Sequence, residues 1–152
     1  MEMAALAQRT TEVALAATLH ARGRRATSQR LILHRALLEL DRHATADELL
    51  RATTERLPHL SLPTVYATLE LFEELGLVHR VPVGSGPVLW DPRPDPHQHF
   101  ACRSCGRVVD LEAPVRAGTA MAAARAAGHA PDGAQLVVMG VCSDCASAGA
   151  HV

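Results

Sequence analysis

Two Cys-x-x-Cys motifs constrain the fold of this chain more than any other feature of its sequence. They hold all of its cysteines, which are Cys102, Cys105, Cys142 and Cys145. Two such motifs can place four thiolates in the tetrahedral shell that zinc prefers. Disulfides or buried thiols are the alternative, but cytosolic disulfides are rare and the spacing is regular. Four thiolates leave no open position for water, so we expect a structural zinc and not a hydrolytic one.

A pair of histidines lies just ahead of the first cysteine motif. Strand alternation would put His97 and His99 on one face, with Gln98 on the other. Asp91 and Asp110 are carboxylates within reach of the same segment. A site of imidazole and carboxylate without sulfur suits iron, manganese or zinc. Spacing alone leaves open the simpler reading, in which the two histidines only line a solvated strand face.

The first part of the chain has the pattern of a winged helix-turn-helix, which we assign to residues 1–90. Three helices are predicted over residues 27–40, 45–57 and 61–76, and two short β-favouring runs around the sequence GSG predict a hairpin. Thr27 and Ser61 are predicted as N-caps, and Thr45 with Glu48 has the capping-box spacing. Gly76 is the expected terminator of the third helix.

Residues 91–152 are richer in β-forming residues and form the predicted second domain. Strands are expected over residues 99–111 and 134–142, with an alanine-rich helix over residues 113–128 between them. A module of about sixty residues rarely stabilises itself without a metal, a disulfide or a partner chain. The predicted fold class is therefore α+β, with a winged helix-turn-helix followed by a small α/β domain that carries a structural zinc.

DNA binding, if present, has to be local, because the formal net charge of the chain is −1. An arginine cluster that precedes and enters the first predicted helix can contact phosphates, through Arg24, Arg25 and Arg30. Thr64, Tyr66 and Thr68 are expected on the outer face of the third helix, where they can reach phosphates or base edges. A helical bundle that binds another protein is the alternative. No apolar run approaches the roughly 20 residues of a membrane span, so we expect a cytoplasmic protein without membrane contact.

Four segments together resemble the ferric uptake regulator (Fur) superfamily of metal-dependent bacterial repressors. They are GRRATSQRLIL, SLPTVYATLELFEELGLV, HQHFACRSCGRVVD and GVCSDC, in this order and spacing. The resemblance covers roughly residues 18–147 and implies a homodimer that binds double-stranded operator DNA and is not an enzyme. It also implies a C-terminal dimerisation domain held by structural Zn²⁺, and a second, regulatory metal that closes the dimer onto DNA. A zinc hydrolase, the competing class, would need an open zinc site.

The resemblance also implies the ligands of the regulatory metal, which are His43, Asp91, His97, His99 and Asp110. Zinc-sensing members usually have a cysteine near residue 92, where this chain has Pro92, and iron sensors commonly have glutamate in place of both aspartates. Aspartate at both positions is similar to the peroxide-sensing branch. In that branch Fe²⁺ and hydrogen peroxide lead to oxidation of a ligand histidine, here His43 or His97, whereas Mn²⁺ supports DNA binding without oxidation.

Two further points follow from the resemblance. The alternative to peroxide sensing is a repressor that responds to the level of iron or manganese. The family usually has arginine where this chain has Ala67, so its operator preference is expected to differ.

Overall fold

The computed structural model describes residues 2–81, 83, 86–93, 95, 97–112 and 117–149, with side chains from residue 11 onward. The chain divides into two compact units, Met1–Pro94 and Asp95–Val152. This division falls four residues after the boundary expected at residue 90. Among the described residues, no helix combines the length and apolar character needed to cross a membrane.

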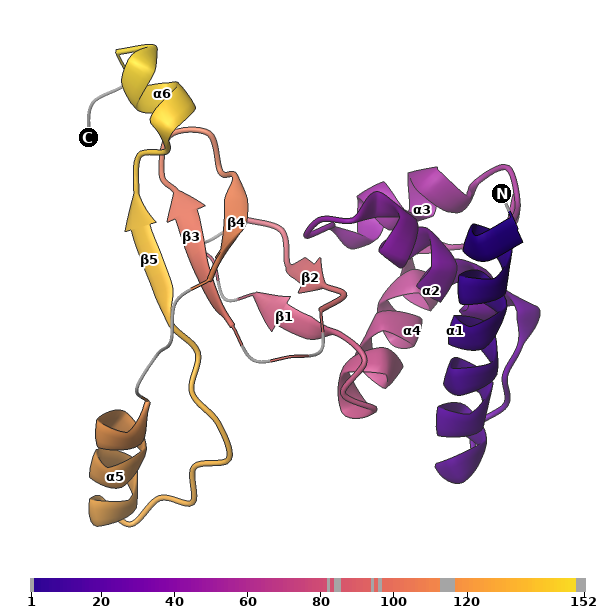
Figure 1. The fold of residues 1–152 in the computed structure, drawn as a ribbon, viewed down its shortest axis with the longest axis horizontal. Coiled ribbons are helices and arrows are strands. Elements are labelled where there is room, and N and C mark those ends of the chain that lie inside the picture. The colour runs from indigo at the N-terminus through magenta and orange to yellow at the C-terminus, as the bar shows by residue number, and fades with distance from the viewer. Residues whose placement is uncertain are drawn as a thin grey trace. The chain divides into compact units, whose positions relative to one another are not determined.

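The first unit consists of helices followed by a two-stranded hairpin (Figure 1). Its elements are α1 (Glu2–Ala21), α2 (Ser28–Leu40), α3 (Ala46–Thr53), α4 (Leu62–Glu74), β1 (His79–Val81) and β2 (Leu89–Asp91). Helices α2 to α4 and the hairpin confirm the predicted winged helix-turn-helix. Helix α1 was not predicted. Its Leu15 and Leu19 are buried one turn apart, and so narrow an apolar stripe gives a weak periodic signal.

Local capping explains where α2 and α3 begin. The Thr27 side chain accepts a hydrogen bond from the backbone N–H of Arg30 at 3.3 Å. At the start of α3, the backbone N–H of Glu48 donates to Thr45 Oγ1 at 3.1 Å, and the backbone N–H of Thr45 donates to Glu48 Oε2 at 2.8 Å. Both predicted caps are confirmed, and each satisfies amides that the helix itself leaves unpaired.

Helix α4 begins differently from the expectation. Ser61 occupies its N-cap but makes no side-chain hydrogen bond to the helix backbone. Its hydroxyl is instead 2.8 Å from the hydroxyl of Thr64. The helix ends just before Gly76, whose φ of +70° lies in the left-handed region that favours glycine. The predicted terminator is confirmed.

The hairpin is joined to the helices through the loop between α2 and α3. Strands β1 and β2 are antiparallel, with Arg80 opposite Trp90. Ala44 pairs with Trp90 from the other side of β2: the N–H of Ala44 donates to the Trp90 carbonyl at 3.0 Å, and the N–H of Trp90 donates to the Ala44 carbonyl at 2.9 Å. The loop residue Ala44 therefore forms a β-bridge to the hairpin.

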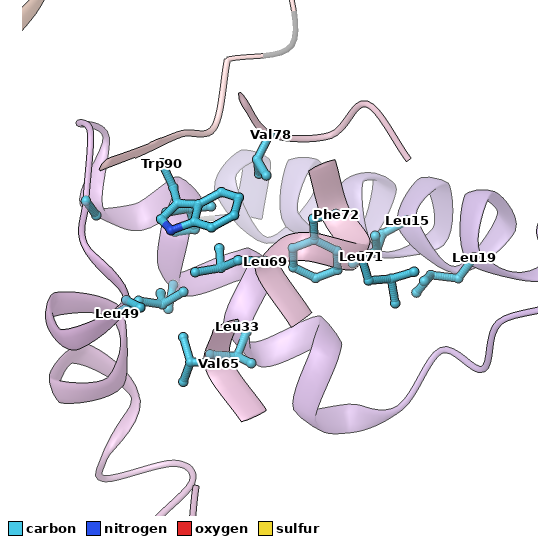
Figure 2. Packing of buried hydrophobic residues seen from close by; sticks show 14 residues of the cluster. Leu15, Leu19, Leu33, Leu49, Val65, Leu69, Leu71, Phe72, Val78 and Trp90 are labelled. Carbon is cyan, nitrogen blue, oxygen red and sulfur yellow. The ribbon is translucent and has the colours of Figure 1, made fainter. Parts of the chain in front are cut away.

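The core of the first unit holds the hairpin against the helices. Trp90 and Phe72 are its largest fully buried side chains, and Figure 2 shows them among leucines and valines from α1 to α4 and Val78. Burying one such aromatic side chain contributes at most about 4–6 kcal/mol, from 150–250 Å² at about 25 cal/mol per Å². Trp90 is therefore a main anchor of the hairpin.

The second unit is a three-stranded sheet with two short helices (Figure 1). Its elements are β3 (Gln98–Cys102), β4 (Val108–Leu111), α5 (Gly118–Ala126), β5 (Val137–Gly140) and α6 (Ser143–Ser147). The strand order is β4-β3-β5, with β4 antiparallel and β5 parallel to β3. A parallel pair needs a long crossover, and the segment that contains α5 provides it. The α+β class is confirmed.

Two boundaries in this unit differ from the expectation. Residues 99–111 form two strands and not one, because Gly106, with φ of +73°, allows a turn in which its N–H donates to the Cys102 carbonyl at 3.0 Å. Helix α5 begins at Gly118, whereas the sequence predicted a start at residue 113. Residues 113–116 lie outside the described part of the chain.

Little of the second unit is buried. Among its described residues, His99 and Cys102 are the buried ones, and neither α5 nor α6 buries a side chain. Several large apolar side chains are exposed, namely Val109, Leu136, Val138 and Met139. A unit with so small a core needs stabilisation from outside the hydrophobic effect, as its length suggested.

One buried histidine belongs to the core of the first unit. His34 lies on α2 and meets the ring of Phe72 edge-on, with ring centroids 5.4 Å apart and planes at 82°. Burial lowers the pKa of His34 below its ordinary value. The folded chain therefore binds this proton less readily than the unfolded chain does. At pH values below the ordinary pKa, the unfolded state binds more protons, and stability falls as the pH decreases.

We predict that His34→Leu reduces the loss of stability on acidification. The free energy of unfolding, measured by urea titration at about pH 7.5 and about pH 5.5, should fall less in this variant than in the wild type. The difference is bounded by about 1.4 kcal/mol per pH unit for one proton. The exposed His20 on α1 gives the control His20→Leu, which should behave as the wild type. Equal losses in all three proteins would contradict the prediction.

Candidate metal centres and DNA-binding face

The four cysteines come together at one end of the sheet in the second unit. Cys102 ends β3, Cys105 lies in the turn before β4, and Cys142 and Cys145 lie just before and within α6. The parallel pairing of β3 with β5 places Cys102 opposite Gly140, which brings the second motif next to the first. All four are free thiols, and their sulfur atoms lie within 4.8 Å of one another.

The geometry of these sulfurs fits a tetrahedral zinc site. Cys105 Sγ and Cys142 Sγ are 3.8 Å apart, and the edge of a tetrahedron with Zn–S bonds of about 2.3 Å is about 3.8 Å. The backbone N–H of Cys142 donates to Cys102 Sγ at 3.3 Å, a contact that favours the thiolate form. The residues present therefore fit a Zn²⁺ ion held by four thiolates.

The pKa values of the thiols also favour a cation bound among the four sulfur atoms. Hydrogen bonds from the backbone of Cys105 and Cys142 lower the pKa of Cys102 to about 6. A hydrogen bond with Ser104 lowers the pKa of Cys145, but the neighbouring thiols of Cys142 and Cys105 outweigh it and raise the pKa to about 12. The lowered pKa of Cys102 could not be predicted from the sequence, because it depends on backbone contacts made by the folded chain. Crowded sulfurs lose all four protons at neutral pH only when a cation is bound among them.

An ion pair connects the two cysteine motifs. Arg107 Nη1 donates to Asp144 Oδ2 at 2.5 Å, and this hydrogen bond raises the pKa of Arg107. Arg107 lies two residues after Cys105, and Asp144 lies between Cys142 and Cys145. Both side chains are more than half exposed, so the pair contributes little energy, but the guanidinium of Arg107 also interacts electrostatically with Cys142 and Cys105.

The histidines and aspartates expected at the regulatory site are divided between the two units. The first unit holds His43 and Asp91, whose Nε2 and Oδ2 atoms are 3.5 Å apart. Both side chains are buried, with exposed fractions of 8% and 3%. The Ala44–Trp90 pair is the reason for their proximity, because His43 precedes Ala44 and Asp91 follows Trp90. The backbone N–H of Arg93 also donates to Asp91 Oδ1 at 2.9 Å.

The second unit holds the other three residues. His97 Nε2 and His99 Nε2 lie 3.2 Å and 3.8 Å from Asp110 Oδ1. His99 is directly opposite Asp110 in the β3–β4 pair, and the two imidazole rings are 4.6 Å apart. His97 Nδ1 is 2.7 Å from the carbonyl of Asp95, so Nδ1 carries the proton and Nε2 faces the carboxylate as a potential ligand atom.

Each group suits a divalent metal of the iron and manganese type. The donors are imidazole nitrogens and carboxylate oxygens without sulfur, a set that binds Fe²⁺, Mn²⁺ or Zn²⁺. The side chains of His97 and His99 are each only 6% exposed, while the side chain of Asp110 is 33% exposed. The expected set is thus present as a pair in one unit and a triad in the other.

The outer face of α4 is only partly as predicted. Thr64 and Tyr66 are half-buried, in the first turns of the helix. Thr68 is a correction: only 6% of it is exposed, and its hydroxyl donates to the Thr64 carbonyl at 2.9 Å. Thr68 lies one helical turn after Thr64 and is packed against the core, so it is not available to contact DNA. Glu70 and Glu74 are exposed farther along α4, which leaves its N-terminal half as the part suited to DNA.

The predicted phosphate contacts lie near the start of α2. Arg24 and Arg25 are exposed, and Arg30 is half-buried, with Nη1 donating to the Arg25 carbonyl at 2.6 Å. Arg24 Nη2 is 4.0 Å from Glu74 Oε2 at the end of α4. The cluster is thus anchored to the same unit as α4 and keeps exposed positive charge.

The neighbours of two further residues, Arg80 and His79, could not be predicted from the sequence. Arg80 contacts Trp90 and α4, and His79 lies directly opposite Asp91 in the hairpin. Only the strand register reveals these neighbours, since a one-residue shift would place both side chains on the other face.

Comparison with known proteins places the chain in a family. The model of the ferric uptake regulator family matches residues 21–138. The chain is 32% identical over 134 residues to the peroxide operon regulator of Bacillus subtilis, covering 88% of this chain and 92% of that protein. It is 29% identical over 133 residues to the peroxide-responsive repressor PerR of Staphylococcus epidermidis, covering 88% and 89%. A solved zinc uptake regulator complexed with zinc and DNA is similar with a TM-score of 0.71 and 25% identity, over 95% of this chain and 98% of that chain. With a family model that spans most of its length, this chain belongs to the ferric uptake regulator family.

Proposed function

We propose that this chain is a metal-dependent DNA-binding repressor that senses hydrogen peroxide through oxidation of a histidine. Its family makes it a transcription regulator, and the peroxide part is carried by the donor set. Three imidazoles and two aspartates, without a cysteine, form the two groups, and every one of these side chains except that of Asp110 is at most 8% exposed. The names of the two relatives described above agree with this proposal.

In this proposal the pair and the triad bind one regulatory ion together. His43 and Asp91 would contribute from the first unit, and His97, His99 and Asp110 from the second. A shared ion restricts how the two units can orient, and so favours the conformation that binds operator DNA. Loss of one ligand releases this restriction, and repression ends.

The proposed sensing step is an oxidation of one imidazole. An Fe²⁺ ion held by these residues would supply the redox chemistry for cleaving the O–O bond of hydrogen peroxide, and the imidazole, which loses two electrons overall, would be the net reductant. One oxygen atom of the peroxide is inserted into a C–H bond of the His43 or His97 ring, and the other leaves as water. The burial of both rings keeps them next to the carboxylates where the reaction begins, while exposed histidines elsewhere in the chain are spared.

The four cysteines serve a structural role in this proposal. Cys102, Cys105, Cys142 and Cys145 would hold Zn²⁺ with no open position for substrate, which argues against a hydrolase. The zinc would compensate for the small core of the second unit, and its exposed apolar side chains would be covered in a homodimer. The dimer would bind a palindromic operator in the cytoplasm through α4 of each copy.

The oxidation is tested by mass spectrometry. We expect that anaerobic loading with Fe²⁺ and brief exposure to peroxide adds one oxygen to the peptide that contains His43 or His97. Mn²⁺-loaded protein should remain unmodified, and the exposed His59 and His129 serve as internal controls. If Fe²⁺ binds and both buried histidines stay intact, the chain responds to the level of iron or manganese.

Removal of zinc should unfold the second unit. Structural zinc contributes about 10–16 kcal/mol of apparent binding free energy at neutral pH, more than a small domain has in total. Cys142→Ser should abolish bound zinc and the hydrogen-exchange protection of β3 to β5, while the core of the first unit stays protected. Ser143→Ala, a change at the neighbouring exposed position, is the control. Retained protection of the sheet in the zinc-free variant would show that zinc is dispensable.

The DNA-binding face is tested by salt dependence. We expect Arg25→Gln to weaken binding and to reduce the slope of log affinity against log salt by about one, because one phosphate contact is lost. Tyr66→Ala should weaken binding to the selected operator more than to random DNA. Thr68→Val should leave both affinities unchanged, since Thr68 is buried. An unchanged salt slope for Arg25→Gln would remove this residue from the interface.

A further inference from the structure

We propose that Arg80 is a positioning residue that transmits the state of the regulatory metal site to helix α4 through Trp90. The inference concerns contacts within the first unit only. It rests on the proposed function, because it assigns a route by which metal binding affects the helix that contacts DNA.

The route begins at the metal ligands of the first unit. His43 and Asp91 flank the two hydrogen bonds between Ala44 and Trp90, at 3.0 Å and 2.9 Å. An ion held by His43 and Asp91 would fix the backbone on both sides of this pair. Trp90 lies on that backbone and is 1% exposed, so a change in the pair moves a large side chain inside a close-packed core.

Few directional contacts fix the orientation of the Trp90 indole. Within the part of the chain that the structure describes, its buried Nε1 makes no hydrogen bond. Packing, the backbone pair with Ala44 and the guanidinium of Arg80 therefore define its orientation. Arg80 lies opposite Trp90 in the hairpin, and its Cζ atom is 4.8 Å from the ring centroid, within the range of a cation–π interaction.

Arg80 is at the same time attached to α4. Its Nε donates to Glu73 Oε2 at 2.7 Å, and its Nη2 donates to Glu70 Oε1 at 3.4 Å. The backbone N–H of Arg80 also donates to Glu73 Oε1 at 3.3 Å. These carboxylates raise the pKa of Arg80, led by the hydrogen bond with Glu73. Both the main chain and the side chain of one residue thus contact α4.

These contacts distinguish Arg80 from an ordinary surface ion pair. An isolated exposed pair contributes little and can be removed without consequence. Arg80 instead touches a core aromatic ring and two carboxylates of α4 with one planar guanidinium, a geometry that a lysine ammonium cannot reproduce. A shift of Trp90 therefore changes the position of α4 relative to the hairpin.

The experiment measures how much metal strengthens DNA binding. The probe is a fluorescein-labelled duplex recovered from a random-sequence library by wild-type protein in Mn²⁺. Fluorescence anisotropy gives the Kd of the zinc-containing protein with Mn²⁺ and without it, and the ratio of the two Kd values reports the coupling. We expect Arg80→Gln to reduce this ratio by about 2- to 30-fold. Removal of a charge near DNA alters both Kd values alike and cancels in the ratio.

Three further variants make the test specific. Glu73→Gln, at the other end of the contact, should reduce the ratio as Arg80→Gln does, and the double variant should lose no more than either single one. Glu73→Gln also keeps the test decisive if Arg80→Gln folds poorly. Arg56→Gln is the matched control, because Arg56 pairs with Glu39 at 3.1 Å in the same unit and is 46% exposed, against 45% for Arg80. Its ratio should equal that of the wild type.

The outcomes separate this inference from the proposed function. A wild-type protein whose DNA affinity does not depend on Mn²⁺ would overturn both. A metal-dependent wild type with an unchanged ratio in Arg80→Gln and Glu73→Gln would overturn the role of Arg80 alone. Additive losses in the double variant, or an equal loss in Arg56→Gln, would also overturn it.

Discussion

The backbone pair between Ala44 and Trp90 is the contact on which the first unit depends. It joins the loop after α2 to the hairpin, and the buried indole of Trp90 anchors this junction in the core. Because His43 and Asp91 are the residues on either side of the pair, the same two hydrogen bonds that complete the fold bring a ligand imidazole to within 3.5 Å of a carboxylate. In the proposed function, the stability of the first unit and metal binding therefore share one structural element, through which an ion would affect a helix that it does not touch.

The second unit has a small core, and its cysteine cluster is the feature that can compensate for it. Its sheet buries few side chains, and helices α5 and α6 bury none that the structure describes. The crowded thiols supply what the core lacks, since a cation among them replaces mutual repulsion with strong bonds. The sulfur-free triad lies on the same sheet, supported by the β3–β4 register. A site of imidazole and carboxylate donors on the same sheet as a four-thiolate site suits the binding of two different metals by one small domain.

Much of this was predictable from the sequence because the signals were local. Thr27, the Thr45–Glu48 box and Gly76 act on amides and dihedral angles within a few residues, so they indicated the starts of α2 and α3 and the end of α4 correctly. The cysteine spacing likewise predicted a four-sulfur cluster. The predictions that were wrong or missing concern packing between segments far apart in the sequence. Thr68 was expected on the outer face of α4, but the packing of this helix places it toward the core. Helix α1 was not predicted, because only Leu15 and Leu19 of its described side chains are buried and the periodic signal is weak.

Residue identity and spacing were enough to indicate the candidate ligands, the starts of α2 and α3, and the family. Which side chains meet, in contrast, depends on how the folded chain packs. The opposition of Arg80 and Trp90, the approach of His43 to Asp91 and the 3.8 Å between Cys105 and Cys142 arise from strand register and from pairing across long stretches of chain. Register is a property of the whole sheet, fixed by the burial of one face against the core, and no local pattern contains it.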